Sequence, residues 1–90
     1  MRTLKASTLD CRTDGDVVQV RQTVRAWATE LGFSLVDQTK LVTAASELAR
    51  NTLRYGGGGT VTLEALENGM KKGLRLVFDD RGPGIADLAL

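Results

Sequence analysis

Hydrophobic residues recur along the chain with two different periods, and the changes of period divide it into successive elements. Residues 3–12 mix Thr and Leu with polar residues, which predicts a strand. The next stretch carries apolar residues at spacings of three and four, which predicts an amphipathic helix. Asp14 and Asp16 precede this helix as candidate capping residues, and Gly32 is a natural end for it. Its apolar positions are Val17, Val20, Val24, Trp27 and Leu31.

A second helix is predicted from Ser34 to about Tyr55. Ser34 and Asp37 fit an N-terminal capping box in which Asp replaces the usual Glu. The four consecutive glycines at 56–59 end this helix, because glycine favours the helical backbone least after proline.

The second half of the chain alternates apolar and polar residues. Residues 60–67 and 74–79 predict the two strands of a hairpin, joined by a turn that opens at Asn68-Gly69 and ends near Gly73. Residues 80–84 predict a loop, and the final segment, ADLAL, has the pattern of a beginning helix. We therefore expect an α+β fold, in which helices pack on one face of a sheet within a single domain spanning residues 1–90.

Composition excludes several kinds of chemistry. The chain has no histidine, which excludes Ser-His-Asp and Cys-His catalysis and His-ligated metals. Its one cysteine, Cys11, excludes an internal disulfide and a thiolate zinc cluster, and suits a reducing compartment. The net charge is +1 with the charges evenly spread, so direct nucleic-acid binding is not expected. No apolar run suits a membrane span or a signal peptide, so we expect a cytoplasmic protein without a membrane partner.

The second helix carries a candidate set of polar residues. Glu47, Asn51 and Tyr55 are each four residues apart and so lie near one helical face. Glu47 offers a carboxylate that can deprotonate a hydroxyl, and the amide oxygen of Asn51 suits a hard cation such as magnesium. Arg54 brings a positive charge beside the glycines. Taken singly, each of these residues is more often an ordinary surface or packing residue.

A second candidate set follows the last predicted strand, at residues 79–84. Glycines at positions 82 and 84 allow a flat ligand to approach the backbone closely, and an Asp at a strand end can accept a hydrogen bond from an amine. The ordinary alternative is a simple turn. No phosphate-binding Walker loop occurs in the chain, and this segment does not open a βαβ unit.

Together, the two sets resemble a known family. The segment Glu47-Leu48-Ala49-Arg50-Asn51, followed by Arg54-Tyr55-Gly56, a hairpin and Asp80-x-Gly82-x-Gly84, is similar to the N box and first glycine box of the GHKL ATPases. The finer similarity is to the small RsbT-type switch serine/threonine kinases, which share the Gly32-Phe33 and Asp37-Gln38 pairs as well. This resemblance implies a two-layer α/β sandwich of the GHKL (Bergerat) type with a mixed, mostly antiparallel sheet.

The resemblance also implies a role for each matched residue. Asn51 would hold the magnesium ion that bridges the phosphates of ATP, and Glu47 would be the general base. Asp80 would accept a hydrogen bond from the adenine amine. The remaining nucleotide-binding positions would be Arg54, Tyr55, Gly82, Gly84 and Ile85.

Family members phosphorylate Ser or Thr on STAS-domain antagonist or scaffold proteins of anti-sigma and stress-response pathways, and then activate a PP2C-type phosphatase. The family's second glycine box and lid follow the first glycine box, and neither motif occurs in residues 85–90. We therefore expect the domain to be C-terminally incomplete, and the 90 residues alone to bind ATP weakly and transfer phosphate poorly or not at all. Two alternatives stay open: a non-catalytic anti-sigma adaptor that retains the nucleotide site, and a histidine-kinase catalytic domain, which the short N-terminal part disfavours.

Overall fold

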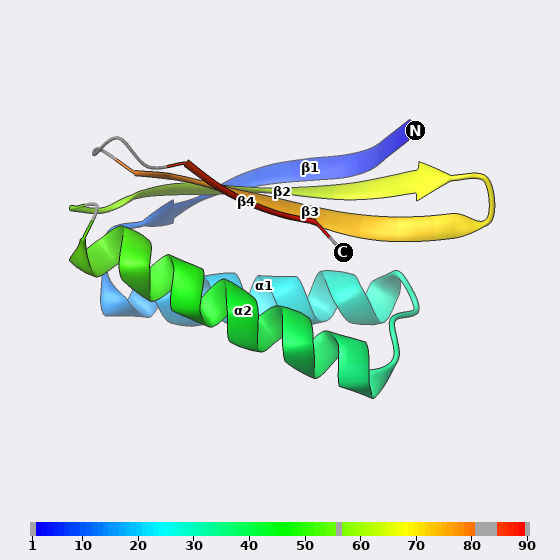
Figure 1. Cartoon of the computed structure of the whole chain (residues 1–90), viewed down its shortest axis with the longest axis horizontal. Coiled ribbons are helices and arrows are strands. Elements are labelled where there is room, and N and C mark those ends of the chain that lie inside the picture. The colour runs from blue at the N-terminus through cyan, green and yellow to red at the C-terminus, as the bar shows by residue number, and fades with distance from the viewer. Residues whose placement is uncertain (1, 56, 81–84, 90) are drawn as a thin grey trace.

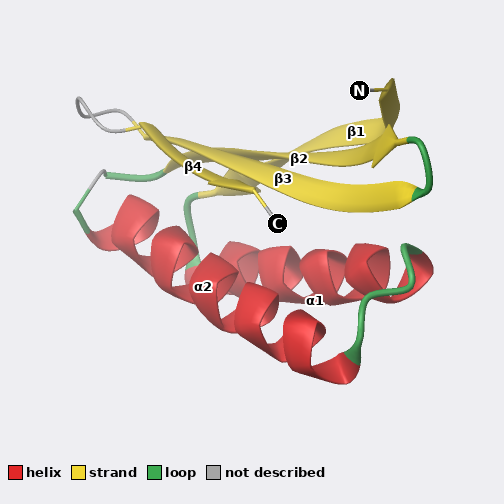
Figure 2. Cartoon of the chain, turned by 45° about the vertical axis from the view of Figure 1, so that its right-hand side comes forward, coloured by secondary structure: helices red, strands yellow, loops and turns green. Residues whose placement is uncertain are grey.

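The computed structural model describes residues 2–55, 57–80 and 85–89, the last of these for the backbone alone. Its elements follow the order β1, α1, α2, β2, β3 and β4. Their bounds are β1 (Arg2–Cys11), α1 (Asp14–Glu30), α2 (Leu35–Arg54), β2 (Gly59–Asn68), β3 (Lys71–Asp80) and β4 (Ile85–Ala89). Figures 1 and 2 show both helices on the same face of the sheet, which confirms the predicted two-layer α+β arrangement.

The four described strands form one sheet in the order β1-β2-β3-β4. All three of their pairings are antiparallel, so the described sheet contains no parallel pair of the kind that a mixed sheet requires. The β2–β3 hairpin turns at Gly69 and Met70, which lie between the paired residues Asn68 and Lys71. Gly69 has a φ of 65°, as the first position of a tight two-residue hairpin turn requires. The turn is therefore shorter than predicted, and β3 begins three residues earlier.

The prediction of a helix in the final segment is wrong. Residues Ile85–Ala89 form β4, which pairs with β3 from Asp79 opposite Ile85 to Arg75 opposite Ala89. The periodicity of so short an apolar run does not separate strand from helix. The edge of β3 offers a row of backbone hydrogen-bonding groups, and a strand satisfies them where a helix cannot.

Both helices begin at a side-chain cap. Ser34 caps α2, since its Oγ accepts a hydrogen bond from the Asp37 amide at 3.2 Å; only this half of the predicted capping box is present in the described chain. The cap of α1 is Thr13 rather than either predicted aspartate. Its Oγ1 accepts from the Asp16 amide at 3.1 Å, and the Asp16 carboxylate accepts in return from the Thr13 amide at 3.2 Å. Asp16 thus supplies the second half of a full capping box.

The hydrophobic core lies between the helices and the sheet. In β2 and β3, alternate residues face the helices and are buried, including Val61, Leu63, Leu76 and Phe78. The helices contribute buried residues at the predicted spacing of three and four. These are Val17, Val20, Val24 and Ala28 of α1, and Leu41, Ala45 and Ala49 of α2. Within the described residues, no helix is both long and apolar enough to cross a membrane.

Candidate functional site

The candidate residues gather at one end of the molecule. Figure 1 shows the C-terminal end of α2, the start of β2 and the end of β3 together at this end, while the β2–β3 turn lies at the opposite end. We call the first of these the glycine end, defined by Asn51, Tyr55, Gly57, Gly59 and Asp80. Antiparallel pairing of β2 with β3 produces this arrangement, because it brings the first residue of β2 beside the last residue of β3.

Glu47 and Asn51 lie on the exposed side of α2. The helix turns about 100° per residue, so two residues four apart differ by only ~40° in direction. Both side chains are exposed, whereas Ala45 and Ala49 point into the core. The spacing therefore places the carboxylate and the amide next to each other, where a ligand can reach both.

Glu47 also lines a shallow groove of about 280 Å³ between the two helices. The groove brings it near two cations, Arg21 of α1 and Arg50 of α2, which the sequence did not single out. Arg50 follows Glu47 by three residues, so helical spacing alone was a usable signal for it. Arg21 belongs to the other helix, and no local pattern relates it to Glu47. The groove gives the Glu47 carboxylate a positively charged surrounding.

Arg54 is the last residue of α2, and Tyr55 is its C-cap. The Tyr55 amide donates to the Asn51 carbonyl at 2.9 Å, so the backbone fixes these two positions relative to each other. The Tyr55 side chain is 83% exposed. This exposure excludes a packing role within the described chain and leaves the ring available for contact with a ligand.

Asp80 ends β3 on the face of the sheet that carries the core residues. It follows the buried residues Leu76 and Phe78 at alternate positions and pairs with Gly59 across the hairpin. Its Oδ1 atom is buried and has no hydrogen-bond partner among the described residues. A buried acceptor without a partner costs about 1–3 kcal/mol, and more when it carries a charge. A ligand that donates a hydrogen bond at this position would remove that cost.

The glycines beside Asp80 have reasons within the fold. Gly57 and Gly58 have φ values of 72° and 91°, which residues with a side chain rarely adopt. A Cβ on Gly59 would lie 2.0 Å from the Asp79 carbonyl oxygen, so no larger residue allows β2 to approach β3 in this way. These three glycines thus shape the turn from α2 into β2, and backbone geometry alone accounts for them.

The other predicted positions are described only in part. Gly56, Gly82 and Gly84 lie outside the described residues. Ile85 is described for its backbone, as the first residue of β4 next to the end of β3. Within the described chain, no three Asp, Glu, Cys or His side chains group as a metal site. A magnesium ion at Asn51 would therefore take most of its ligands from a bound phosphate chain and from water, which is its usual way of binding.

Comparison with known proteins follows the matched motifs. No protein-family model matches the chain, and no solved structure matches it. Among curated proteins, the serine/threonine-protein kinase RsbT of Bacillus subtilis (strain 168) is 47% identical to it over 76 residues. The match covers 84% of this chain, which spans 57% of the length of the relative. The predicted resemblance to the RsbT-type proteins is therefore confirmed, for the part of the relative that this chain matches.

Proposed function

We propose that the chain is the ATP-binding part of a serine/threonine kinase in a partner-switching pathway, with Mg²⁺ and ATP as its cofactors. The observation that carries this proposal is the buried Asp80 Oδ1, an acceptor without a partner in the described chain at the end that also holds Asn51 and Tyr55. The similarity to RsbT supports the kinase class. From the same resemblance, we propose STAS-domain proteins as substrates and a PP2C-type phosphatase as a further partner.

The chain's own residues would divide the work of binding. Asp80 would accept a hydrogen bond from the exocyclic amine of adenine, and Tyr55, being exposed, would contact the nucleotide beside it. Asn51 would supply one oxygen to magnesium. Arg54 would contribute positive charge near the phosphates, because it lies one residue before Tyr55 on the same helix end. Gly82, Gly84 and Ile85 would line the base, as their match to the first glycine box implies.

Glu47 would act on the substrate rather than on the nucleotide. Phosphoryl transfer depends mainly on positioning and on neutralising charge, with magnesium supplying much of the latter. The acceptor hydroxyl must lose its proton as the new bond to phosphorus forms, and the exposed Glu47 carboxylate would accept that proton. Arg21 and Arg50, which line the same groove, would stabilise a negatively charged group held beside Glu47.

Binding is tested first, by calorimetric titration of MgATP into this 90-residue chain and into the longest gene product that contains it. We expect weak binding to the chain and tighter binding to the longer protein. In both proteins, Asn51→Asp should reduce the magnesium dependence of binding. Lys40→Gln is the matched control, because Lys40 is also exposed on α2 and lies about two turns before Glu47. Absence of MgATP binding to both proteins would overturn the proposal.

Catalysis is tested with the longer protein, radiolabelled ATP and a STAS-domain substrate. Glu47→Gln should abolish most of the transfer while leaving MgATP affinity nearly unchanged, because it removes the proton acceptor and keeps the shape. Transfer that survives this substitution unchanged would show that Glu47 is not the base. If partner binding alone reproduces regulation without any transfer, the protein is an adaptor with a retained nucleotide site.

A further inference from the structure

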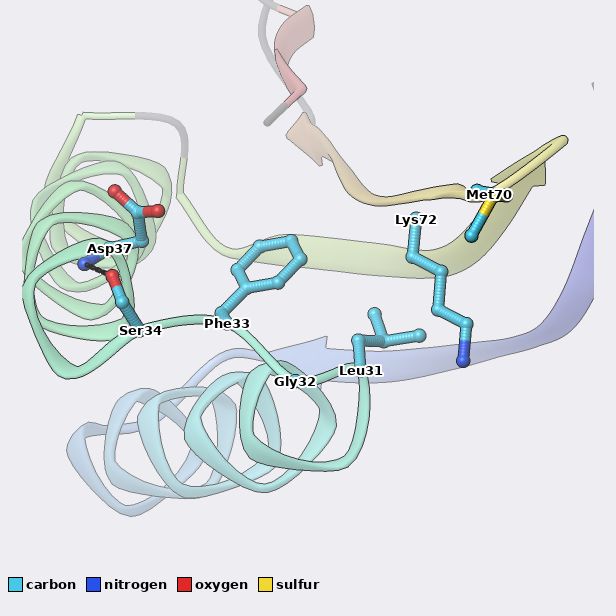
Figure 3. Close-up of a pocket in the computed structure, with 7 residues that line it drawn as sticks. All are labelled: Leu31, Gly32, Phe33, Ser34, Asp37, Met70 and Lys72. Atoms are coloured by element: carbon cyan, nitrogen blue, oxygen red, sulfur yellow. Dashed lines mark hydrogen bonds between the residues drawn. The ribbon is translucent and has the colours of Figure 1, made fainter.

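A second open surface lies at the end of the molecule farthest from Asp80. A cavity of about 500 Å³ opens between the α1–α2 loop and the β2–β3 turn (Figure 3). Figure 3 shows Leu31 and Phe33 in the loop on one side, Met70 and Lys72 of the hairpin on the other, and Ser34 and Asp37 at the start of α2. A smaller groove of about 250 Å³ shares Leu31 and Lys72 with it, so the hollow continues toward β1.

Apolar side chains around this cavity are unusually exposed. Leu35 is 76% exposed, Val36 is 63% exposed, and Met70 is fully exposed at the tip of the hairpin. Leu4, which lines the smaller groove, is 39% exposed. A small globular domain gains by burying such residues, and a cluster of them around a hollow is typical of a protein-binding site. We call this cluster the hairpin-end surface. It comprises Leu31, Phe33, Leu35, Val36, Met70 and Lys72.

The frame of this surface is held in place by hydrogen bonds. The buried Gln38 side chain donates to the Phe33 carbonyl at 2.8 Å, and its oxygen accepts from the Thr29 hydroxyl at 3.2 Å. The Phe33 amide donates to the Ala28 carbonyl at 3.0 Å. The loop that presents Phe33 is thus fixed to both helices, so a partner would bind it without first ordering it.

Charge at this end favours an acidic partner. Lys71 and Lys72 are exposed, and neither has an acidic side chain within 4.0 Å among the described residues. Lys5, by contrast, pairs with Glu30 at 2.6 Å. The two unpaired lysines also disfavour a second copy of this chain as the occupant, because a symmetric contact through the hairpin would bring four like charges together.

We propose that the hairpin-end surface binds an acidic amphipathic helix of a partner protein. The apolar side of that helix would enter the cavity beside Leu31 and Phe33 and contact Met70, and its carboxylates would pair with Lys71 and Lys72. This inference goes beyond the proposed kinase activity and does not depend on ATP binding. Because the surface and the glycine end lie at opposite ends of the molecule, a partner held here leaves the candidate nucleotide site open.

The test uses a synthetic peptide of about eleven residues, or three helical turns, made of Leu, Phe and Glu with the apolar residues at spacings of three and four. Titration into the isotope-labelled 90-residue chain should shift the amide signals of Phe33, Leu35, Met70 and Lys72. The same peptide with Gln in place of every Glu should bind about tenfold more weakly, and the affinity for the acidic peptide should fall with salt.

Two variants and their matched controls locate the binding. Lys72→Glu and Met70→Ser should each weaken binding of the acidic peptide about tenfold. Arg25→Glu and Val18→Ser, which change an exposed cation and an exposed apolar residue of α1, should leave it unchanged. The proposal is overturned if the shifted signals lie elsewhere, if the Gln peptide binds equally well, or if sedimentation shows a dimer that Met70→Ser dissociates.

Discussion

The two ends of this molecule present opposite kinds of surface. At the glycine end, small residues bring backbone segments close together, and a buried carboxylate oxygen lacks a partner among the described residues. At the hairpin end, the buried polar groups of Gln38 are hydrogen-bonded, and large apolar side chains stand in solvent instead. An unsatisfied acceptor selects a ligand with a donor at a fixed point, whereas exposed apolar area selects a broad complementary surface.

This contrast separates two demands on one small fold. A small polar ligand is recognised by a few hydrogen bonds at defined positions, and a protein partner by area and charge. Placing them at opposite ends keeps each surface independent of the other. Four predictions test whether the two ends differ as described, from the largest expected effect to the smallest.

Gly59→Ala should be the most damaging change at the glycine end. The added Cβ would meet the Asp79 carbonyl oxygen at 2.0 Å, and backbone on both strands would have to move. We expect a loss of about 3 kcal/mol in the free energy of unfolding, measured by urea denaturation. Gly57→Ala is the control: no atom lies within 4 Å of its Cβ, and only its positive φ opposes the change, at a cost of about 1 kcal/mol. Equal losses for the two variants would refute the steric explanation.

Gln38→Leu should be the most damaging polar change at the hairpin end. It removes the donor to the Phe33 carbonyl and the acceptor for the Thr29 hydroxyl, and leaves a partly buried carbonyl unpaired. The expected loss of unfolding free energy is about 2 kcal/mol. Gln22→Leu, at an exposed position of α1, should change stability by less than about 0.5 kcal/mol. If both variants unfold at the same urea concentration, Gln38 does not hold the loop.

Asp80→Ala should weaken ligand binding without weakening the fold. Because Oδ1 has no partner in the described chain, removing it should leave the unfolding free energy unchanged or raise it. MgATP affinity should fall at least about tenfold, or about 1.4 kcal/mol, in calorimetric titration. Asp79→Ala is the neighbouring control, because Asp79 is exposed on the outer face of the sheet. A large loss of stability in Asp80→Ala alone would show that the carboxylate has a structural role.

Cys11 gives the smallest predicted effect, a dependence of stability on pH. Burial, and secondly the charge of Asp16, raise the pKa of the Cys11 thiol above its ordinary value. The folded state therefore keeps this proton at pH values where the unfolded chain has lost it. Stability should fall as the pH rises past the thiol pKa of the unfolded chain, and the fall should stop above the folded-state pKa.

Denaturation curves between pH ~7 and ~10 measure this dependence. Cys11→Ala should remove the part of the slope that belongs to the thiol, at the cost of the weak hydrogen bond from Sγ to the Ala49 carbonyl at 3.3 Å. Other groups that titrate in alkali contribute equally to both proteins, so the difference between the two slopes is the relevant quantity. Identical slopes would mean that Cys11 ionises as readily in the folded state as in the unfolded one.

Local patterns predicted those parts of the fold that depend on neighbouring residues. The period of three and four located both helices, Ser34 was identified as a cap, and alternation found β2 and β3. The strand β4 was missed because the open edge of β3, and not the segment's own periodicity, determines its conformation. Thr13 was missed because two aspartates beside it also favour a helix start.

The candidate site divides in the same way. The common face of Glu47 and Asn51 follows from helical spacing, so the sequence predicted it. The burial of Asp80 Oδ1 depends on how β3, β2 and α2 meet, and no local pattern contains that information. The hairpin-end surface was not predicted either, because Leu35 and Met70 come from segments far apart in the sequence.

The pairing of β1 with β2 has a consequence for how the protein folds. β2, β3 and β4 pair with their neighbours in the sequence, but both helices lie between β1 and β2, so this pairing closes a long loop. Loop closure slows the formation of such contacts relative to hairpins. Gly58 rests against the backbone of Cys11 and Arg12 at the end of β1. The glycine end therefore takes its final shape only when β1 docks, which ties completion of the candidate nucleotide site to the slowest step of assembly.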